Sequence, residues 1–114
     1  MLVYARDNAV AAPTDAQLGA AVVALRMLAD ETRLCLMWHL SRENHDVGTL
    51  ARLSGAARPS VSQHLAKLRL AGLVHAERIG RRVVYTVAGG HVRRLVDEAL
   101  MAADHQVSGL PPHD

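Results

Sequence analysis

Residues 48–74 read GTLARLSGAARPSVSQHLAKLRLAGLV, and this stretch has the pattern of two short helices joined by a turn. Val47–Ser54 has the apolar spacing of a short helix, and Gly55 suits the left-handed residue that often ends one. Pro59 is tolerated in a first helical turn, so a second helix is predicted from there to about Leu70. Two short helices joined by a glycine-containing turn predict a helix-turn-helix. The residues expected to face inward are Leu50 and Leu53, then Val61, Leu65, Leu68 and Gly72.

Two more helices are predicted before this motif. Thr14 and Asp15 can cap a helix that extends to about Ala29 with one apolar face. Residues 30–40 form the next helix, which is apolar nearly all round and is therefore expected to be central, and Ser41–Asp46 is a polar loop. The apolar residues are Leu18, Val22, Leu25 and Leu28 in the first helix and Leu34, Leu36, Met37, Trp38 and Leu40 in the second.

A hairpin and a last helix are predicted after the motif. Residues 73–79 and 83–87 are rich in β-branched side chains and flank Gly80-Arg81-Arg82, which indicates a hairpin with a basic tip. A final helix is expected over His91–His105. The expected fold class is mainly α with a small β-hairpin. One domain over residues 14–105 would lie between a flexible arm (1–13) and a flexible tail (106–114).

Composition excludes several classes of protein. The chain has 114 residues, of which half are hydrophobic and 21% are charged, which fits one folded domain. Cys35 is the single cysteine, so one chain cannot form an internal disulfide or a cysteine-based metal cluster. Without a long apolar run or a secretory signal pattern, we expect a cytoplasmic protein with no membrane partner. No catalytic motif occurs at diagnostic spacing, which argues against an enzyme.

The distribution of charge is more informative than its total. The formal net charge is only +2, but it is −2 over residues 1–51, +6 over residues 52–82 and −2 over residues 83–114. A basic middle between acidic ends is typical of a surface that faces a polyanion such as DNA.

The second helix of the motif has the composition of a helix that lies in a DNA groove. Small polar side chains lie opposite its apolar face, basic residues stand at both ends, and the hairpin tip adds two arginines. The alternatives are an ordinary solvated face, or an interaction module that has lost DNA binding. His64 borders the apolar face, so a packing role is the alternative there. The candidate DNA-binding residues are Arg58, Ser60, Ser62, Gln63, His64, Lys67, Arg69, Arg81 and Arg82.

Three stretches together resemble the ArsR/SmtB family of bacterial winged-helix repressors. They are ADETRLCLMWHL at 29–40, the stretch at 48–74, and IGRRVVYTV at 79–87, and the resemblance covers about residues 15–105. It implies a winged helix-turn-helix homodimer that binds double-stranded, palindromic operator DNA. It also implies that the first and last helices form the dimer interface. An effector, commonly a metal, then changes DNA binding.

The resemblance further implies where a metal would bind. One group of the family uses a Cys-x-Cys pair at the first helix of the motif, but the matching stretch here, HDVGT at 45–49, has no cysteine. Another group uses Asp-x-His at the start of the last helix and His-x-x-His or His-x-x-Glu near its end. His91 and His105 match two of these positions, whereas Gly89 and Ala102 occupy the others. Asp104, beside His105, is a candidate substitute ligand.

The spacing of the two histidines favours a site shared between two chains. Fourteen residues separate His91 from His105, so they share a helix face but lie about 21 Å apart along the axis. Antiparallel packing of two such helices would bring His91 to the partner's His105. Imidazole and carboxylate donors suit Ni²⁺, Zn²⁺ or Co²⁺. The stretch HVRRLVDEA at 91–99 resembles nickel- and cobalt-responsive actinobacterial members, which favours nickel. The alternative is a regulator that does not itself respond to metal and acts with a co-regulator protein.

Overall fold

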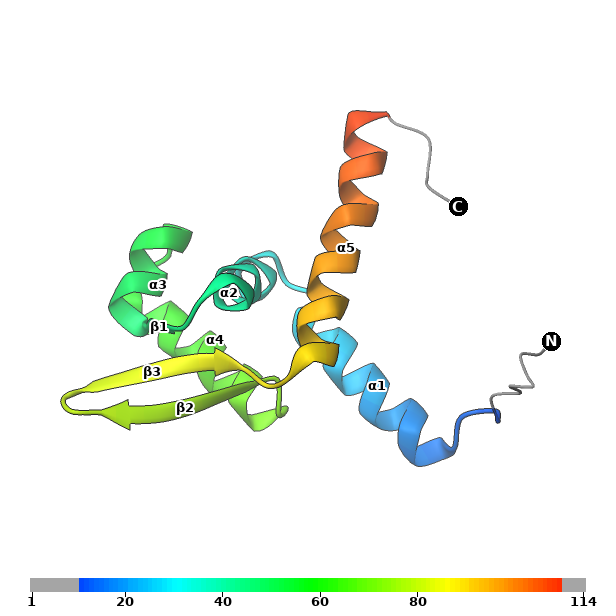
Figure 1. The fold of residues 1–114 in the computed structure, drawn as a ribbon, viewed down its shortest axis with the longest axis horizontal. Helices are drawn as coiled ribbons and strands as arrows, with labels where there is room; N and C mark the ends of the chain where they lie inside the picture. The colour runs from blue at the N-terminus through cyan, green and yellow to red at the C-terminus, as the bar shows by residue number, and fades with distance from the viewer. Residues whose placement is uncertain (1–10, 110–114) are drawn as a thin grey trace.

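The computed structural model describes residues 11–109, so residues 1–10 of the predicted arm and 110–114 of the predicted tail lie outside the described part. Five helices and three short strands make up that part (Figure 1). In chain order they are α1 (Asp15–Leu28), α2 (Glu31–Arg42), β1 (His45–Asp46), α3 (Val47–Ser54), α4 (Arg58–Leu70), β2 (Val74–Ile79), β3 (Arg82–Val87) and α5 (Gly90–Ser108).

The three strands form an antiparallel sheet in the order β1-β3-β2. β2 and β3 make the predicted hairpin, paired from Val74 opposite Val87 to Ile79 opposite Arg82, and Gly80 takes the positive φ of 65° that the tight turn requires. β1 adds to the other edge of β3, with His45 opposite Tyr85. The mainly helical fold with a small hairpin confirms the expected class, and we call the β2–β3 hairpin the wing.

Three details of the sequence interpretation were wrong. Gly72, which was expected to face inward, is exposed and lies in the turn after α4. The predicted loop Ser41–Asp46 is not a loop throughout, because α2 continues to Arg42 and His45–Asp46 pair with β3. A two-residue strand is too short to show alternation, and only its partner strand stabilises it. Leu53 is 43% exposed instead of facing inward, and Leu50 and Ala51 are the buried residues of α3.

Residues from every helix and from the wing form one aliphatic core. α2 is central to it as predicted, with Leu36, Met37 and Leu40 fully buried, although Trp38 on its outer side is 40% exposed. α3 and α4 pack on α2, and Gly55 joins them in the left-handed conformation (φ 75°). The remaining buried apolar residues are Leu28, Leu50, Ala51, Val61, Leu65, Leu68, Leu73, Val74, Val87 and Val96.

Helices α1 and α5 extend away from this body (Figure 1). Large apolar side chains on both helices are exposed. On the predicted apolar face of α1, Leu18, Val22 and Leu25 are 43–53% exposed, and only Leu28 is buried. α5 runs from Gly90 to Ser108, beyond the predicted end at His105, and Val96 is its one buried residue. None of the described helices is long and apolar enough to cross a membrane.

Candidate nucleic-acid interface

Helix α4 presents a polar face to solvent because its apolar face is anchored in the core. Val61, Leu65 and Leu68 are fully buried and recur at helical spacing. The side chains opposite are small or basic and extend outward. Of the predicted DNA-binding residues on α4, Arg58, Ser62, Gln63, Lys67 and Arg69 are exposed, whereas Ser60 and His64 are half-buried.

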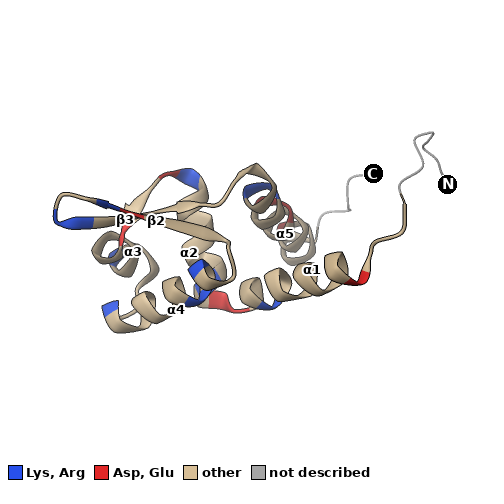
Figure 2. Cartoon of the chain, turned by 90° about the horizontal axis from the view of Figure 1, so that it is seen from below, with Lys and Arg blue, Asp and Glu red and all other residues tan. Residues whose placement is uncertain are grey.

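The basic residues gather around the motif and the wing. Figure 2 shows Lys and Arg at the tip of the wing and near both ends of α4. Arg81 lies in the turn of the hairpin, and Arg82 is the first residue of β3. The structure therefore brings two parts of the predicted DNA-binding set, the start of α4 and the wing tip, close together, since Arg58, Arg81 and Arg82 line one cavity.

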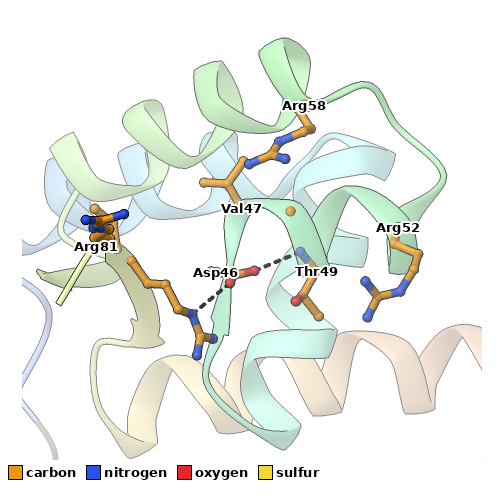
Figure 3. A pocket seen from close by; sticks show the side chains of 9 residues that line it. Asp46, Val47, Thr49, Arg52, Arg58 and Arg81 are labelled. Atoms are coloured by element: carbon orange, nitrogen blue, oxygen red, sulfur yellow. Dashed lines mark hydrogen bonds and ion pairs between the residues drawn. The ribbon is translucent and has the colours of Figure 1, made fainter. Parts of the chain in front are cut away.

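An open cavity lies where the starts of α3 and α4 approach the wing (Figure 3). It has a volume of about 540 Å³ and is lined mainly by polar and charged residues. Arg58, Arg81 and Arg82 from the predicted set line it together with Arg52 of α3 and the carboxylate of Asp46. The residues that sequence reasoning assigned to separate elements therefore contribute to one concave basic surface.

Asp46 organises this surface by joining α3 to the wing. One of its carboxylate oxygens accepts the backbone N–H of Thr49 at 2.8 Å, which caps α3, and the other accepts from Arg82 Nε at 3.0 Å (Figure 3). The hydrogen bonds from Thr49, followed by the Arg82 guanidinium, lower the pKa of Asp46 to about 2. The carboxylate therefore stays charged at neutral pH.

His64 does not extend toward solvent with the other α4 residues. Its Nδ1 lies 3.3 Å from Arg33 Nη1, and Arg33 Nε donates to the carbonyl of Met27 at 2.6 Å. The backbone N–H of Arg33 in turn donates to Asp30, the cap of α2, and this bond lowers the pKa of Asp30. Arg33 thus joins the end of α1, the start of α2 and the middle of α4.

The predicted metal ligands lie along α5 and do not meet within one chain. His91 is in the first turn, where its Nδ1 lies 3.0 Å from Arg94 Nη2, and His105 is half-buried near the other end. Asp104 is exposed and lines a groove between α2 and α5 with Asp97. No group of three or more His, Cys, Asp or Glu side chains that could hold a metal ion occurs among the described residues.

The sequence analysis missed three residues that shape the candidate DNA-binding interface or position its helices: Arg52, Arg33 and Asp46. Arg52 was counted only as part of the basic segment. Arg33 was missed because its contact with His64 spans 31 positions, and no local pattern reveals such a contact. Asp46 could have been found, because an aspartate three residues before Thr49 at the start of a short helix is a typical capping arrangement.

The fold and the position of the basic face define a winged helix-turn-helix. Residues 30–76 match the model of the bacterial regulatory protein arsR family. The HTH-type transcriptional regulator KmtR of Mycobacterium tuberculosis is 44% identical over 99 residues, which cover 87% of this chain and 76% of that protein. NmtR of the same organism is 38% identical over 104 residues, covering 90% of this chain and 87% of that protein.

A solved structure agrees with these relatives. A homodimeric winged helix-turn-helix DNA-binding domain from Mycobacterium bovis shares 29% identity and matches 92% of this chain and all of that domain with a TM-score of 0.77. The chain belongs to the arsR family of bacterial regulatory proteins. It is a transcriptional regulator of the helix-turn-helix type and not an enzyme.

Proposed function

We propose that the protein is a homodimeric transcriptional regulator, specifically a repressor, that binds palindromic operator DNA. In this proposal a divalent metal changes its affinity for DNA, and nickel is the first candidate. The observation that carries the DNA part is that Arg58, at the start of α4, lines one cavity with Arg81 and Arg82 of the wing, while the polar side chains farther along α4 are exposed. The polar residues of α4 would contact base edges, and the arginines would contact phosphates. The proposed DNA contacts are Arg58, Ser60, Ser62, Gln63, Lys67, Arg69, Arg81 and Arg82.

His64 receives a different role in this proposal. Because its Nδ1 lies against Arg33 of α2, His64 positions α4 relative to α2 instead of reaching DNA. This fits the packing alternative for His64 that the sequence left open.

The uncovered faces of α1 and α5 support the dimer. Large apolar side chains such as Leu18, Val22 and Leu25 on α1 and Met101 on α5 are 43–55% exposed. Several large exposed apolar side chains at helical spacing, as on α1, are typical of an interface. A second copy of the chain is the occupant that the family resemblance implies.

The metal part rests on the donors that α5 carries. His91, Asp104 and His105 supply the imidazole and carboxylate groups that suit Ni²⁺, Zn²⁺ or Co²⁺. Because His91 and His105 are far apart on one helix, two copies would have to share each ion, and metal binding would then act on the dimer. In the structure, His91 Nδ1 lies against the Arg94 guanidinium, which can only donate a hydrogen bond, so the lone pair of Nδ1 is occupied. Arg94 would have to move away before Nδ1 could bind a metal ion.

The second candidate is a regulator of the same fold that is not itself metal-responsive and acts with a co-regulator protein. Gly89 and Ala102 at two of the family's ligand positions favour it. The two candidates differ in whether metal changes the affinity for DNA and in whether a co-regulator protein takes part.

Fluorescence anisotropy on DNA from upstream of the protein's own operon tests both parts. We expect tight, strongly salt-dependent binding and two half-sites about one helical turn apart. Nickel should change the affinity tenfold or more, a coupling of about 1.4 kcal/mol. The H91A/H105A variant should bind DNA but lose the response, and R81A/R82A should lose affinity with or without metal. Tight binding that does not change with nickel, zinc or cobalt would refute the metal-responsive candidate and favour the second one.

A further inference from the structure

Three half-buried polar side chains join the start of α2 to the middle of α4. They are Asp30, the N-cap of α2, Arg33 in the first turn of α2, and His64 of α4. Arg33 Nη1 lies 3.3 Å from His64 Nδ1, and the Asp30 carboxylate accepts the backbone N–H of Arg33 at 2.9 Å. This backbone bond is the largest cause that lowers the pKa of Asp30, and the charges of Arg33 and His64 add to it. Asp30 and His64 therefore act on each other through their charges.

The contact with Arg33 requires a neutral His64 ring. A guanidinium has donors only, so Nδ1 accepts a hydrogen bond from Arg33 only while it carries no proton. A proton from solvent that adds to Nδ1 removes this acceptor and places two positive charges against each other. Histidine is the side chain that ordinarily gains such a proton between about pH 5 and 8. The contact is therefore of a kind that a change of pH can break.

Asp30 is the group that can receive the protonated ring. Its carboxylate can accept several hydrogen bonds, and its charge already acts on His64. Helix α3 and strand β2 also pack on α4, but among the described residues they supply no hydrogen bond or ion pair to His64. The charged groups placed against this ring are thus Arg33, which repels its protonated form, and Asp30, which attracts it.

Arg33 connects this ring to α1 as well. Its Nε donates to the carbonyl of Met27 at 2.6 Å, in the last turn of α1. While His64 is neutral, one guanidinium therefore holds the end of α1 and the middle of α4 together. A protonated His64 that pairs with Asp30 leaves Arg33 bonded to α1 alone, and α4 then loses its side-chain tie to that helix.

We propose that His64 is a positioning residue whose protonation releases α4 from Arg33 and thereby weakens the binding of operator DNA. The proposal rests on the proposed function, because α4 is the helix that would contact base edges. It predicts the sign of the effect. Binding becomes weaker as pH falls, whereas a His64 that contacted DNA itself would gain attraction to phosphates when protonated.

Fluorescence anisotropy on operator DNA between about pH 5.5 and 7.5, at constant ionic strength and without metal, tests this sign. H64N retains an acceptor near the position of Nδ1 but does not titrate. Relative to H64N, the unmodified protein should lose affinity on the order of tenfold over this range, since such a hydrogen bond contributes about threefold in each of two chains. H75N is the matched control, because His75 is exposed on β2 and has no contact with Arg33, so it should retain the loss. Equal pH dependence in the unmodified protein and H64N, or tighter binding of the unmodified protein at low pH, would overturn the proposal.

D30N tests the second partner of the ring. Asparagine is also a good N-cap, so α2 keeps its cap, but the charge that attracts the protonated ring is removed. The loss of affinity should then begin at a pH lower by about 0.5 unit, because the protonated form has lost its counter-charge. An unchanged or higher midpoint would overturn the role given to Asp30.

Side-chain NMR of the free protein separates this proposal from the proposed function. The Nε–H resonance of Arg33 should change with pH at the same midpoint as the His64 ring, and it should stay constant in H64N. If the protein fails to bind operator DNA but Arg33 follows His64, the regulator proposal fails and the exchange of partners stands. If operator DNA binds, Arg33 does not respond and the affinity relative to H64N is constant, the role of His64 is refuted and the regulator proposal stands. A response of Arg33 without any change in relative affinity would also refute the proposal, because the titration would then be local.

Discussion

Replacing Asp46 by alanine should destabilise the fold by about 1–2 kcal/mol. The carboxylate caps α3 through the N–H of Thr49, and losing such a cap typically costs about 1 kcal/mol. It also pairs with Arg82, and because that arginine is largely exposed, the pair adds only about 0.2–1 kcal/mol. Both contacts are lost in D46A, whereas D46N retains an oxygen for the cap and loses the charge. We therefore expect D46N to cost less than about 1 kcal/mol.

Urea unfolding measures this difference. Protein concentration has to be the same for all variants, because association of chains contributes to the apparent stability. The urea concentration at the unfolding midpoint should decrease in the order unmodified protein, D46N, D46A. The slope of the unfolding free energy against urea concentration should be the same for all three. Equal losses in D46A and D46N would refute the reasoning, because they would assign the whole effect to the charge and none to the cap.

The same carboxylate gives stability a defined dependence on pH. Folding lowers the pKa of Asp46 from its ordinary value of 3.8 to about 2, chiefly through the hydrogen bonds from Thr49. A lowered folded-state pKa means that the stabilisation is fully present above about pH 4 and is lost as pH falls toward 2. D46N should lack this component, so the difference between it and the unmodified protein should shrink as the pH is lowered through that window.

Three further changes test other contacts. G55A should cost about 1 kcal/mol in urea unfolding, because Gly55 has φ 75° and a side chain is strained there although the space around it is open. A double-mutant cycle of R33M and H64A should give a coupling of about 0.5–3 kcal/mol, and additive losses would show that the two side chains do not interact. D97N should cost less than about 1 kcal/mol, since its partner Arg42 is 47% exposed, and a larger loss would mean that the pair matters more than its exposure suggests.

The sequence predicted the parts of the fold that rest on local patterns. The Gly55 C-cap, the early proline of α4 and the glycine turn of the wing are each marked by a residue whose backbone chemistry admits few alternatives. β1 could not be predicted, because two residues show no period and His45–Asp46 is a strand only beside β3. Leu53 was misassigned because a helix of two turns has too few positions to separate the core face from its border.

The candidate site was predictable in composition but not in arrangement. Charge counting found the basic segment, and spacing separated the polar face of α4 from its core face. Neither could show that Arg82 is held by Asp46 or that His64 faces Arg33, because those partners are 36 and 31 positions away. Contacts between distant elements depend on the angles at which helices pack on one another. The spacing of apolar residues within one helix does not reveal those angles.

The three contacts of Arg33 have a consequence for the length of the operator. If two chains meet through α1 and α5, the angle between α1 and α4 decides how far apart the two α4 helices lie. Arg33 holds that angle by bonding the last turn of α1 with one side of its guanidinium and the middle of α4 with another. In such a dimer, the number of base pairs between half-sites would be set in part by a side chain that touches neither the DNA nor the second chain.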